Sequence, residues 1–147
     1  MKFTGKIDVP ASRQAVFEKL RDAHFFASCV DGVADLVEID DRHYTATLES
    51  RVAYIKFKFA VTVEIVELDE PNRVVAKVEG TPIGMVGRLT ATAAANIEEQ
   101  DGGTAVHYEL DVALTGKLGS LGQPVLRSKA KEMEKQFAAR LAAAFAA

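Results

Sequence analysis

The last thirty residues constrain the fold of this chain more than any other stretch. Apolar side chains recur there at steps of three and four, at Leu126, Ala130, Met133, Phe137, Leu141 and Phe145. This spacing places them on one face of a helix, and Pro124 suits a first helical turn. A helix from Pro124 to the end would be about 35 Å long at 1.5 Å per residue. We therefore predict a long helix that crosses a sheet and closes an apolar interior.

Residues 52–68 alternate between apolar and polar side chains with a period of two. The apolar positions are Ile55, Phe57, Phe59, Val61, Val63 and Ile65. This pattern is typical of a strand with one buried and one wet face. The phase slips at Val66 and continues at Leu68, which predicts a β-bulge or the strand end.

The other segments complete an α+β fold. We predict helices over residues 13–21, capped by Ser12, and 23–30. The remaining strands are expected over residues 3–9, 33–39, 43–50, 74–78, 88–98 and 106–114, with a loop over 80–87. The order predicts a curved antiparallel sheet of about seven strands, wrapped around the C-terminal helix, with two short helices after strand 1. We expect residues 1–147 to form one domain.

Composition narrows the functional classes. The formal net charge of -3 argues against nucleic-acid binding, which usually needs a strong basic excess. A single cysteine, Cys29, excludes an internal disulfide, and we expect it to be buried and inert. No apolar run approaches the roughly 20 residues of a membrane span. The expected location is the cytoplasm.

The sequence offers little for catalysis or metal binding. His24, His43 and His107 are far apart, and phosphate-loop and nucleophile-elbow motifs are absent, so we expect no metal or cofactor. An enzyme would need an inward acid or base, for which Tyr44, Tyr108 and His24 are the candidates. Whether the chain is an enzyme stays open, with a non-catalytic role favoured.

The apolar interior is either a filled core or a ligand cavity. Ala91, Ala93 and Ala95 face large side chains, and such pairs either interdigitate or leave room for a ligand. The cavity hypothesis names these candidate contacts: Phe25, Tyr44, Phe57, Phe59, Met85, Leu89, Tyr108, Leu126, Met133 and Phe137. The loop around Met85, with Gly84 and Gly87, is either a flexible hairpin or a gate over the cavity.

A basic stretch begins the last helix, at Lys117, Arg127, Lys129 and Lys131. It is either a solvated face with ion pairs such as Lys131–Glu134, or a weak docking patch for anionic lipid or an acidic partner. At about 1 kcal/mol for each basic residue, the attachment would be transient.

Four pieces of the chain resemble one family. They are the opening MKFTGKIDVPASRQAVFEKLRD, CVDGV from Cys29, the TPIG and GRLTATA region from Thr81, and LTGKLGSLGQPVLRSKAKEMEKQFAARL from Leu114. Together they resemble the family of the carbon monoxide dehydrogenase G subunit, in the SRPBCC (START-like, helix-grip) superfamily. The chain departs from it at Asp31-Gly32, where the family usually has a Pro-Gly turn.

The resemblance implies a hydrophobic-ligand-binding accessory protein. The ligand would be a quinone or lipid, and the partner a molybdenum hydroxylase of the carbon monoxide dehydrogenase type. Some relatives carry a C-terminal tail for membrane contact, whereas this sequence stops at Ala147. Contact with the inner face of the membrane is therefore expected to be peripheral and transient. The alternatives are a cavity-based cyclase or hydrolase, and an assembly module without a ligand.

Overall fold

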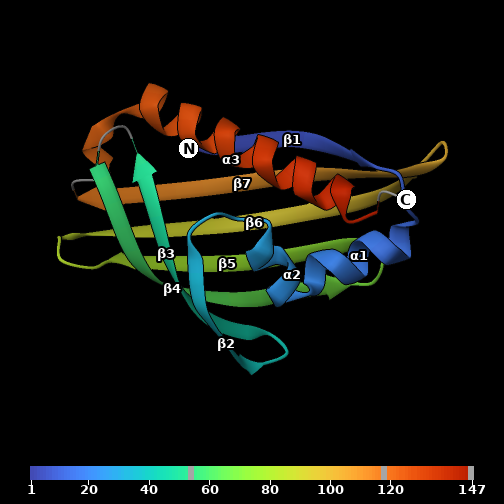
Figure 1. The fold of residues 1–147 in the computed structure, drawn as a ribbon, viewed down its shortest axis with the longest axis horizontal. Helices are drawn as coiled ribbons and strands as arrows, with labels where there is room; N and C mark the ends of the chain where they lie inside the picture. Colours follow the sequence, from blue (N-terminus) through green and yellow to red (C-terminus); the bar gives the residue numbers. More distant parts are fainter. Residues whose placement is uncertain (53–54, 117–118, 146–147) are drawn as a thin grey trace.

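The chain forms one curved sheet with helices on one face (Figure 1). The computed structural model describes residues 1–52, 55–116 and 119–145. Its elements are β1 (Lys2–Val9), α1 (Arg13–Arg21), α2 (Ala23–Ser28), β2 (Val33–Asp40), β3 (His43–Val52), β4 (Ile55–Asp69), β5 (Arg73–Pro82), β6 (Gly87–Gln100), β7 (Gly103–Gly116), a 3-10 turn η1 (Gly119–Leu121) and α3 (Gln123–Ala143).

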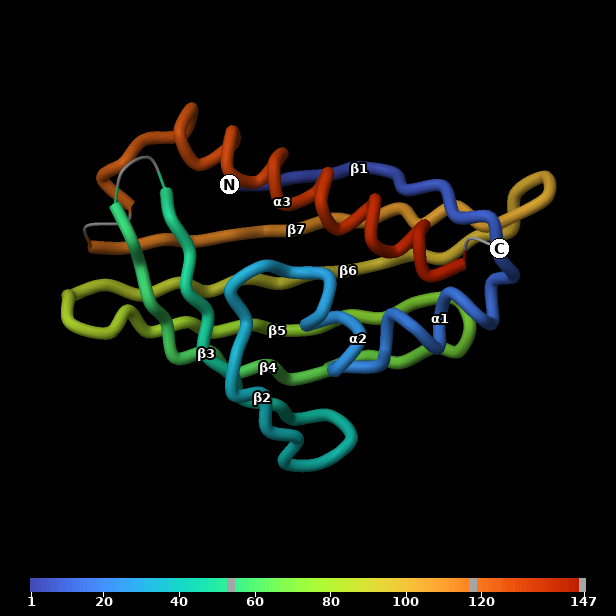
Figure 2. Tube along the Cα trace, viewed as in Figure 1, coloured from blue at the N-terminus to red at the C-terminus, as the bar shows by residue number. Residues whose placement is uncertain are grey.

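The seven strands have the order β1-β7-β6-β5-β4-β3-β2, and every neighbouring pair is antiparallel. Strands β2 to β7 form a meander. The last strand of the meander, β7, also pairs with β1, as the trace in Figure 2 shows. The predicted helix-grip architecture is confirmed, including the two short helices after β1.

Local sequence sets the ends of the first two helices. The Ser12 Oγ accepts a hydrogen bond from the Ala15 N–H at 3.2 Å, which satisfies a donor that the helix leaves free. The Asp22 carboxylate does the same for α2, where it accepts from the His24 and Phe25 N–H groups. Helix α1 has the predicted bounds, whereas α2 ends at Ser28, earlier than predicted.

The longest strand carries the predicted bulge. In β4 the register with β5 shifts between Ile65 and Glu67, which returns Leu68 to the inward face. The predicted loop over residues 80–87 is shorter, because β5 continues to Pro82 and leaves residues 83–86 as the turn.

The buried core has two separate centres. One contains Phe17 of α1 and Leu141 of α3, both fully buried, packed against Ile97 and Val106. The other contains Val52, Phe57 and Phe59 at the opposite end of the sheet. Helix α3 spans both, since Phe137 packs against the first cluster and Leu126 against the second. The sheet between the two clusters is the surface of functional interest.

Candidate ligand-binding face beneath the C-terminal helix

Two cross-strand rows cover the middle of the inner face, and most of their side chains are small or branched. Strand register defines the first row as Tyr44, Val63, Val78, Ala91 and Val112, and the second as Ile65, Ala76, Ala93, Leu110 and Phe3. Apart from Tyr44, all of these are half-buried, whereas the two clusters beside them hold fully buried residues. The middle of the inner face is therefore covered less completely than its ends.

Helix α3 lies over this floor. Its residues Ala130, Met133 and Phe137 are half-buried, while Arg127 and Lys131 on the other side are exposed. The Phe137 ring contacts the ring of Phe26 in α2, with centroids 4.9 Å apart. Helix α3 thus touches both the sheet and the short helices.

A polar rim borders the gap between α3 and the loop that follows α2. The Arg140 guanidinium donates to the Asp31 carboxylate at 2.7 Å, which ties α3 to this loop. A hollow of about 50 Å³ lies beside this contact. It is lined by Val30, Asp31, Ser50, Lys129, Glu132, Met133 and Gln136.

A tyrosine and a carboxylate join the sheet to the helix. Tyr108 of β7 lies opposite Gly5 of β1, and a methyl group on Gly5 would overlap its phenol ring and hydroxyl. The hydroxyl hydrogen-bonds to Glu134 of α3, and burial, followed by this bond, raises the Tyr108 pKa above its usual range. Glu134 therefore points inward, and the ion pair formed on this helix is Lys129–Glu132 at 3.7 Å. The ion pair Lys131–Glu134, which the sequence suggested, is not formed, because Glu134 bonds to Tyr108 instead.

The predicted ligand contacts divide between the two clusters. Phe57 and Phe59 are buried core, and Met85, Leu89 and Leu126 pack against them. Phe25, Tyr108 and Phe137 pack against the other cluster, and Met133 lines the small hollow beside Asp31. The buried Tyr44 donates its hydroxyl to the Asp41 carbonyl at 2.9 Å, and burial raises its pKa. The structure does not gather these ten residues into one site.

The sequence did not predict that the two cross-strand rows in the middle of the sheet form a surface of their own. Val63, Val78 and Val112 belong to neither buried cluster, and none of them is among the ligand contacts predicted from the sequence. Their signal was the combination of inward parity and small size on adjacent strands. Only strand register shows that they lie side by side.

Arg127, Lys131 and His24 lie on the surface, whereas Cys29 is buried. Arg127 stacks over the Phe3 ring at 5.2 Å, Lys131 is exposed and Lys117 lies outside the described residues. His24 is exposed and does not line the inner face. The thiol of Cys29 is buried, and this burial raises its pKa, as expected for an inert cysteine.

His43 sits between two carboxylates on the outer face. Its Nδ1 lies 2.8 Å from Asp40 and its Nε2 lies 3.2 Å from Glu64. These two hydrogen bonds raise the His43 pKa. Across the described ranges, three or more ligand side chains do not gather into a possible metal site.

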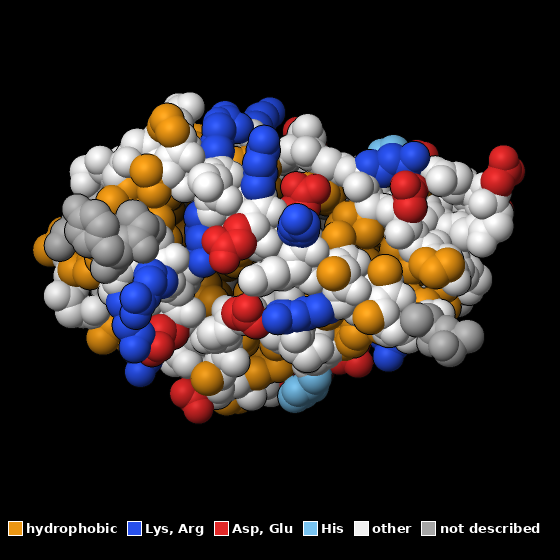
Figure 3. Space-filling model, turned by 45° about the horizontal axis from the view of Figure 1, so that its top comes forward, with side chains coloured by type: hydrophobic (Ala, Val, Ile, Leu, Met, Phe, Trp, Pro, Cys, Tyr) orange, Lys and Arg blue, Asp and Glu red, His pale blue; other side chains and the backbone are white. Residues whose placement is uncertain are grey.

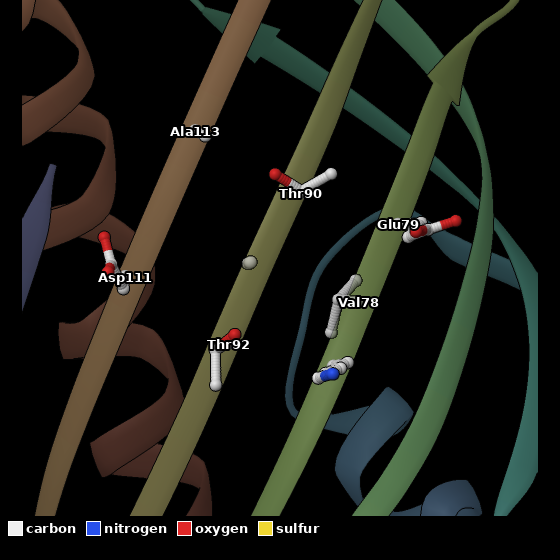
Figure 4. Close-up of a pocket in the computed structure, with 8 residues that line it drawn as sticks. Val78, Glu79, Thr90, Thr92, Asp111 and Ala113 are labelled. Atoms are coloured by element: carbon white, nitrogen blue, oxygen red, sulfur yellow. The ribbon is translucent and has the colours of Figure 1, made fainter.

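A second hollow lies on the outer face of the sheet. It has a volume of about 230 Å³ and crosses β5, β6 and β7 (Figure 4). Its lining includes Lys77, Thr92 and Asp111, which point away from the helices. This hollow is open to solvent and separate from the inner face.

Comparison with known proteins identifies the family. The family model of the carbon monoxide dehydrogenase G subunit (CoxG) matches residues 5–146. The chain belongs to the CoxG family. In this CoxG family member no helix of the described ranges is long and apolar enough to cross a membrane. A comparison with curated protein sequences gave no match.

Solved structures show the same fold. A conserved protein from Geobacillus kaustophilus is 23% identical, with a TM-score of 0.87 and coverage of 97% of this chain and 93% of that one. A START superfamily protein from Mycobacterium smegmatis is 11% identical, with a TM-score of 0.72 and coverage of 97% and 94%. This CoxG family member therefore has a START-like fold.

Proposed function

We propose that this protein binds a hydrophobic molecule, a quinone or lipid, between α3 and the middle rows of the sheet. The observation that supports this is the half-buried floor between two buried clusters. Apolar side chains in a full core are close-packed and exclude water. In the proposed complex the apolar ligand lies between this half-buried floor and the long helix, where it would cover the floor more completely.

The family membership supports an accessory role beside a larger enzyme. We propose that the partner is a molybdenum hydroxylase of the carbon monoxide dehydrogenase type, to which the ligand passes at the membrane. The rim between α3 and Asp31 is the proposed ligand entrance, because the ion pair that closes it is exposed to solvent. The Arg140 and Asp31 side chains of its ion pair are 39% and 63% exposed. Exposed pairs of this kind contribute about 0–1 kcal/mol, so they open readily.

The test compares one substitution on the two faces of the sheet. Ala93→Leu fills the inner face, whereas Ala113→Leu adds the same side chain to the outer face, where Ala113 is exposed. The purified protein is extracted for bound quinone and lipid, and then titrated with a short-chain quinone. We expect Ala93→Leu to weaken binding roughly tenfold or more, which corresponds to about 1.4 kcal/mol. Ala113→Leu should bind like the wild type.

Stability separates an open interior from a filled one. Overpacking a filled core costs about 1–3 kcal/mol, whereas leucine in an open space costs little. We expect the free energy of unfolding of Ala93→Leu to be close to that of the wild type in urea. A large loss of stability, together with no quinone or lipid bound to the wild type, would contradict the proposal and favour an assembly module.

A further inference from the structure

The turn between β5 and β6 exposes two apolar side chains at the end of the molecule. Ile83 is 52% exposed and Val86 is 88% exposed. A methyl group added to Gly84 would meet no atom within 4 Å, so the turn projects into open space. Met85 points the other way and packs against the cluster of Phe57 and Phe59. The turn is thus anchored by one side chain and presents two others to solvent.

Basic side chains lie on the strands that flank this turn, β4 and β6, and on β3 next to β4. The Ile83 N–H donates to the Lys58 carbonyl at 2.8 Å, which places β4 beside it. Lys58 and Arg51 are exposed and have no ion-pair partner in the described part of the chain. Lys56 pairs with Glu49 at 3.0 Å, and Arg88 pairs with Glu79 at 2.9 Å.

The local charge is opposite in sign to that of the whole chain. Residues 49–52, 55–58 and 79–88 hold four basic and two acidic side chains, whereas the chain has a formal net charge of -3. Figure 3 shows hydrophobic side chains at this end of the molecule, at the left, with Lys and Arg side chains beside them.

We propose that the turn of residues 83–86 inserts into the surface of an anionic lipid bilayer. Two apolar side chains on a narrow projection suit the boundary between headgroups and acyl chains, and the flanking cations suit anionic headgroups. A stable protein partner would need about 800 Å² on this side, which such a tip does not offer. The bilayer is therefore the occupant that shape and charge favour.

This contact places the membrane at one end of the proposed binding site. Met85, Val125 and Leu126 pack on the same cluster, so the turn adjoins the beginning of α3. The functional link rests on the proposed ligand binding, but docking itself needs no ligand. Under this proposal the main membrane contact is the turn at the end of the sheet, rather than Arg127 and Lys131 of α3.

The test uses sedimentation with phosphatidylcholine vesicles that contain or lack phosphatidylglycerol. We expect binding to the anionic vesicles and loss of binding at high salt. Ile83→Ser with Val86→Ser should weaken it roughly tenfold, because two apolar side chains lose their burial. Arg51→Gln with Lys58→Gln should weaken it by at least as much, roughly fivefold for each cation.

Matched variants at distant positions serve as controls. Val37 and Ile39 of the edge strand β2 are 54% and 64% exposed, so Val37→Ser with Ile39→Ser removes similar apolar surface elsewhere. Lys6→Gln with Arg42→Gln removes two charges far from the turn. Both control variants should bind vesicles like the wild type.

Four results would overturn the proposal. They are no binding to either vesicle type, equal binding to both, wild-type binding by the turn variant, and loss caused only by Arg127→Gln with Lys131→Gln. The quinone titration of the same proteins separates the two proposals. A protein that docks but neither binds quinone nor yields bound lipid on extraction refutes the ligand proposal alone, and one that binds quinone without docking refutes the membrane proposal alone.

Discussion

One set of contacts joins α3 to the edge of the sheet, and it involves Gly5, Tyr108 and Glu134. Without a side chain at Gly5, the Tyr108 ring can lie across β1 and reach α3. The phenol then donates to the Glu134 carboxylate, and a charge-assisted bond of this kind is stronger than a neutral one. A glycine in the middle of a strand usually weakens the strand. Here the close approach of the Tyr108 ring explains why glycine occupies position 5.

We predict that Gly5→Ala destabilises the protein through this contact. The new methyl group overlaps the Tyr108 ring, and overpacking of this kind costs about 1–3 kcal/mol. In a Tyr108→Leu background the same change should cost much less, because the ring is gone. Urea unfolding of the four proteins measures the coupling. Equal costs in both backgrounds would show that the ring does not occupy the space above Gly5.

Helix α3 is held unequally along its length. Leu141 near its end is fully buried between β1, β7 and α1 residues, whereas Met133 in its middle is only half-buried. Stability within a protein varies with such local packing, and weakly packed segments open more often. The middle of α3 is therefore the part of the helix that we expect to open most often.

We predict that Leu141→Ala costs about 2–5 kcal/mol, while Met133→Ala costs clearly less. The reason is that only Leu141 leaves a cavity in a closed core. Urea unfolding measures both, and amide hydrogen exchange should be faster around Met133 than around Leu141. Equal costs and equal exchange would mean that α3 is packed uniformly, which would leave no room beneath it.

On the scale of the whole molecule, charge and core are both unevenly distributed. The core has two centres with a half-buried floor between them, and the basic turn of residues 83–86 adjoins one of these centres. At the other end of β4, Asp69 is exposed, and the exposed Glu67 pairs with Arg73 at 3.1 Å. Such a molecule would approach an anionic surface with one end first.

Global stability should depend on pH near neutrality through His43. Its folded-state pKa is raised by hydrogen bonds to Asp40 and Glu64, so its contribution is fully present below the unfolded pKa of about 6.5. The contribution is lost as pH rises through the folded-state pKa. We therefore expect His43→Gln to flatten the pH dependence of the free energy of unfolding above about pH 6.5. An unchanged slope in chemical denaturation would show that His43 does not gain these partners in solution.

The sequence by itself determined the elements and their order. Alternation in residues 52–68, the Ser12 cap and the helical spacing of the last segment are local signals, because period and capping depend on near neighbours. The bulge at Val66 followed from the same alternation. The family resemblance was also readable from the sequence, and the family match confirmed it.

Only the tertiary structure decided which inward residues became core. Phe57 and Phe59 share their strand parity with Val63, yet the first two are buried in a cluster and Val63 is half-buried. Parity shows which face a side chain occupies, but not what lies opposite, which depends on strand register and on the path of α3. For the same reason the sequence alone indicated a surface position for Glu134. In the structure Glu134 bonds to the hydroxyl of Tyr108, whose ring lies over Gly5.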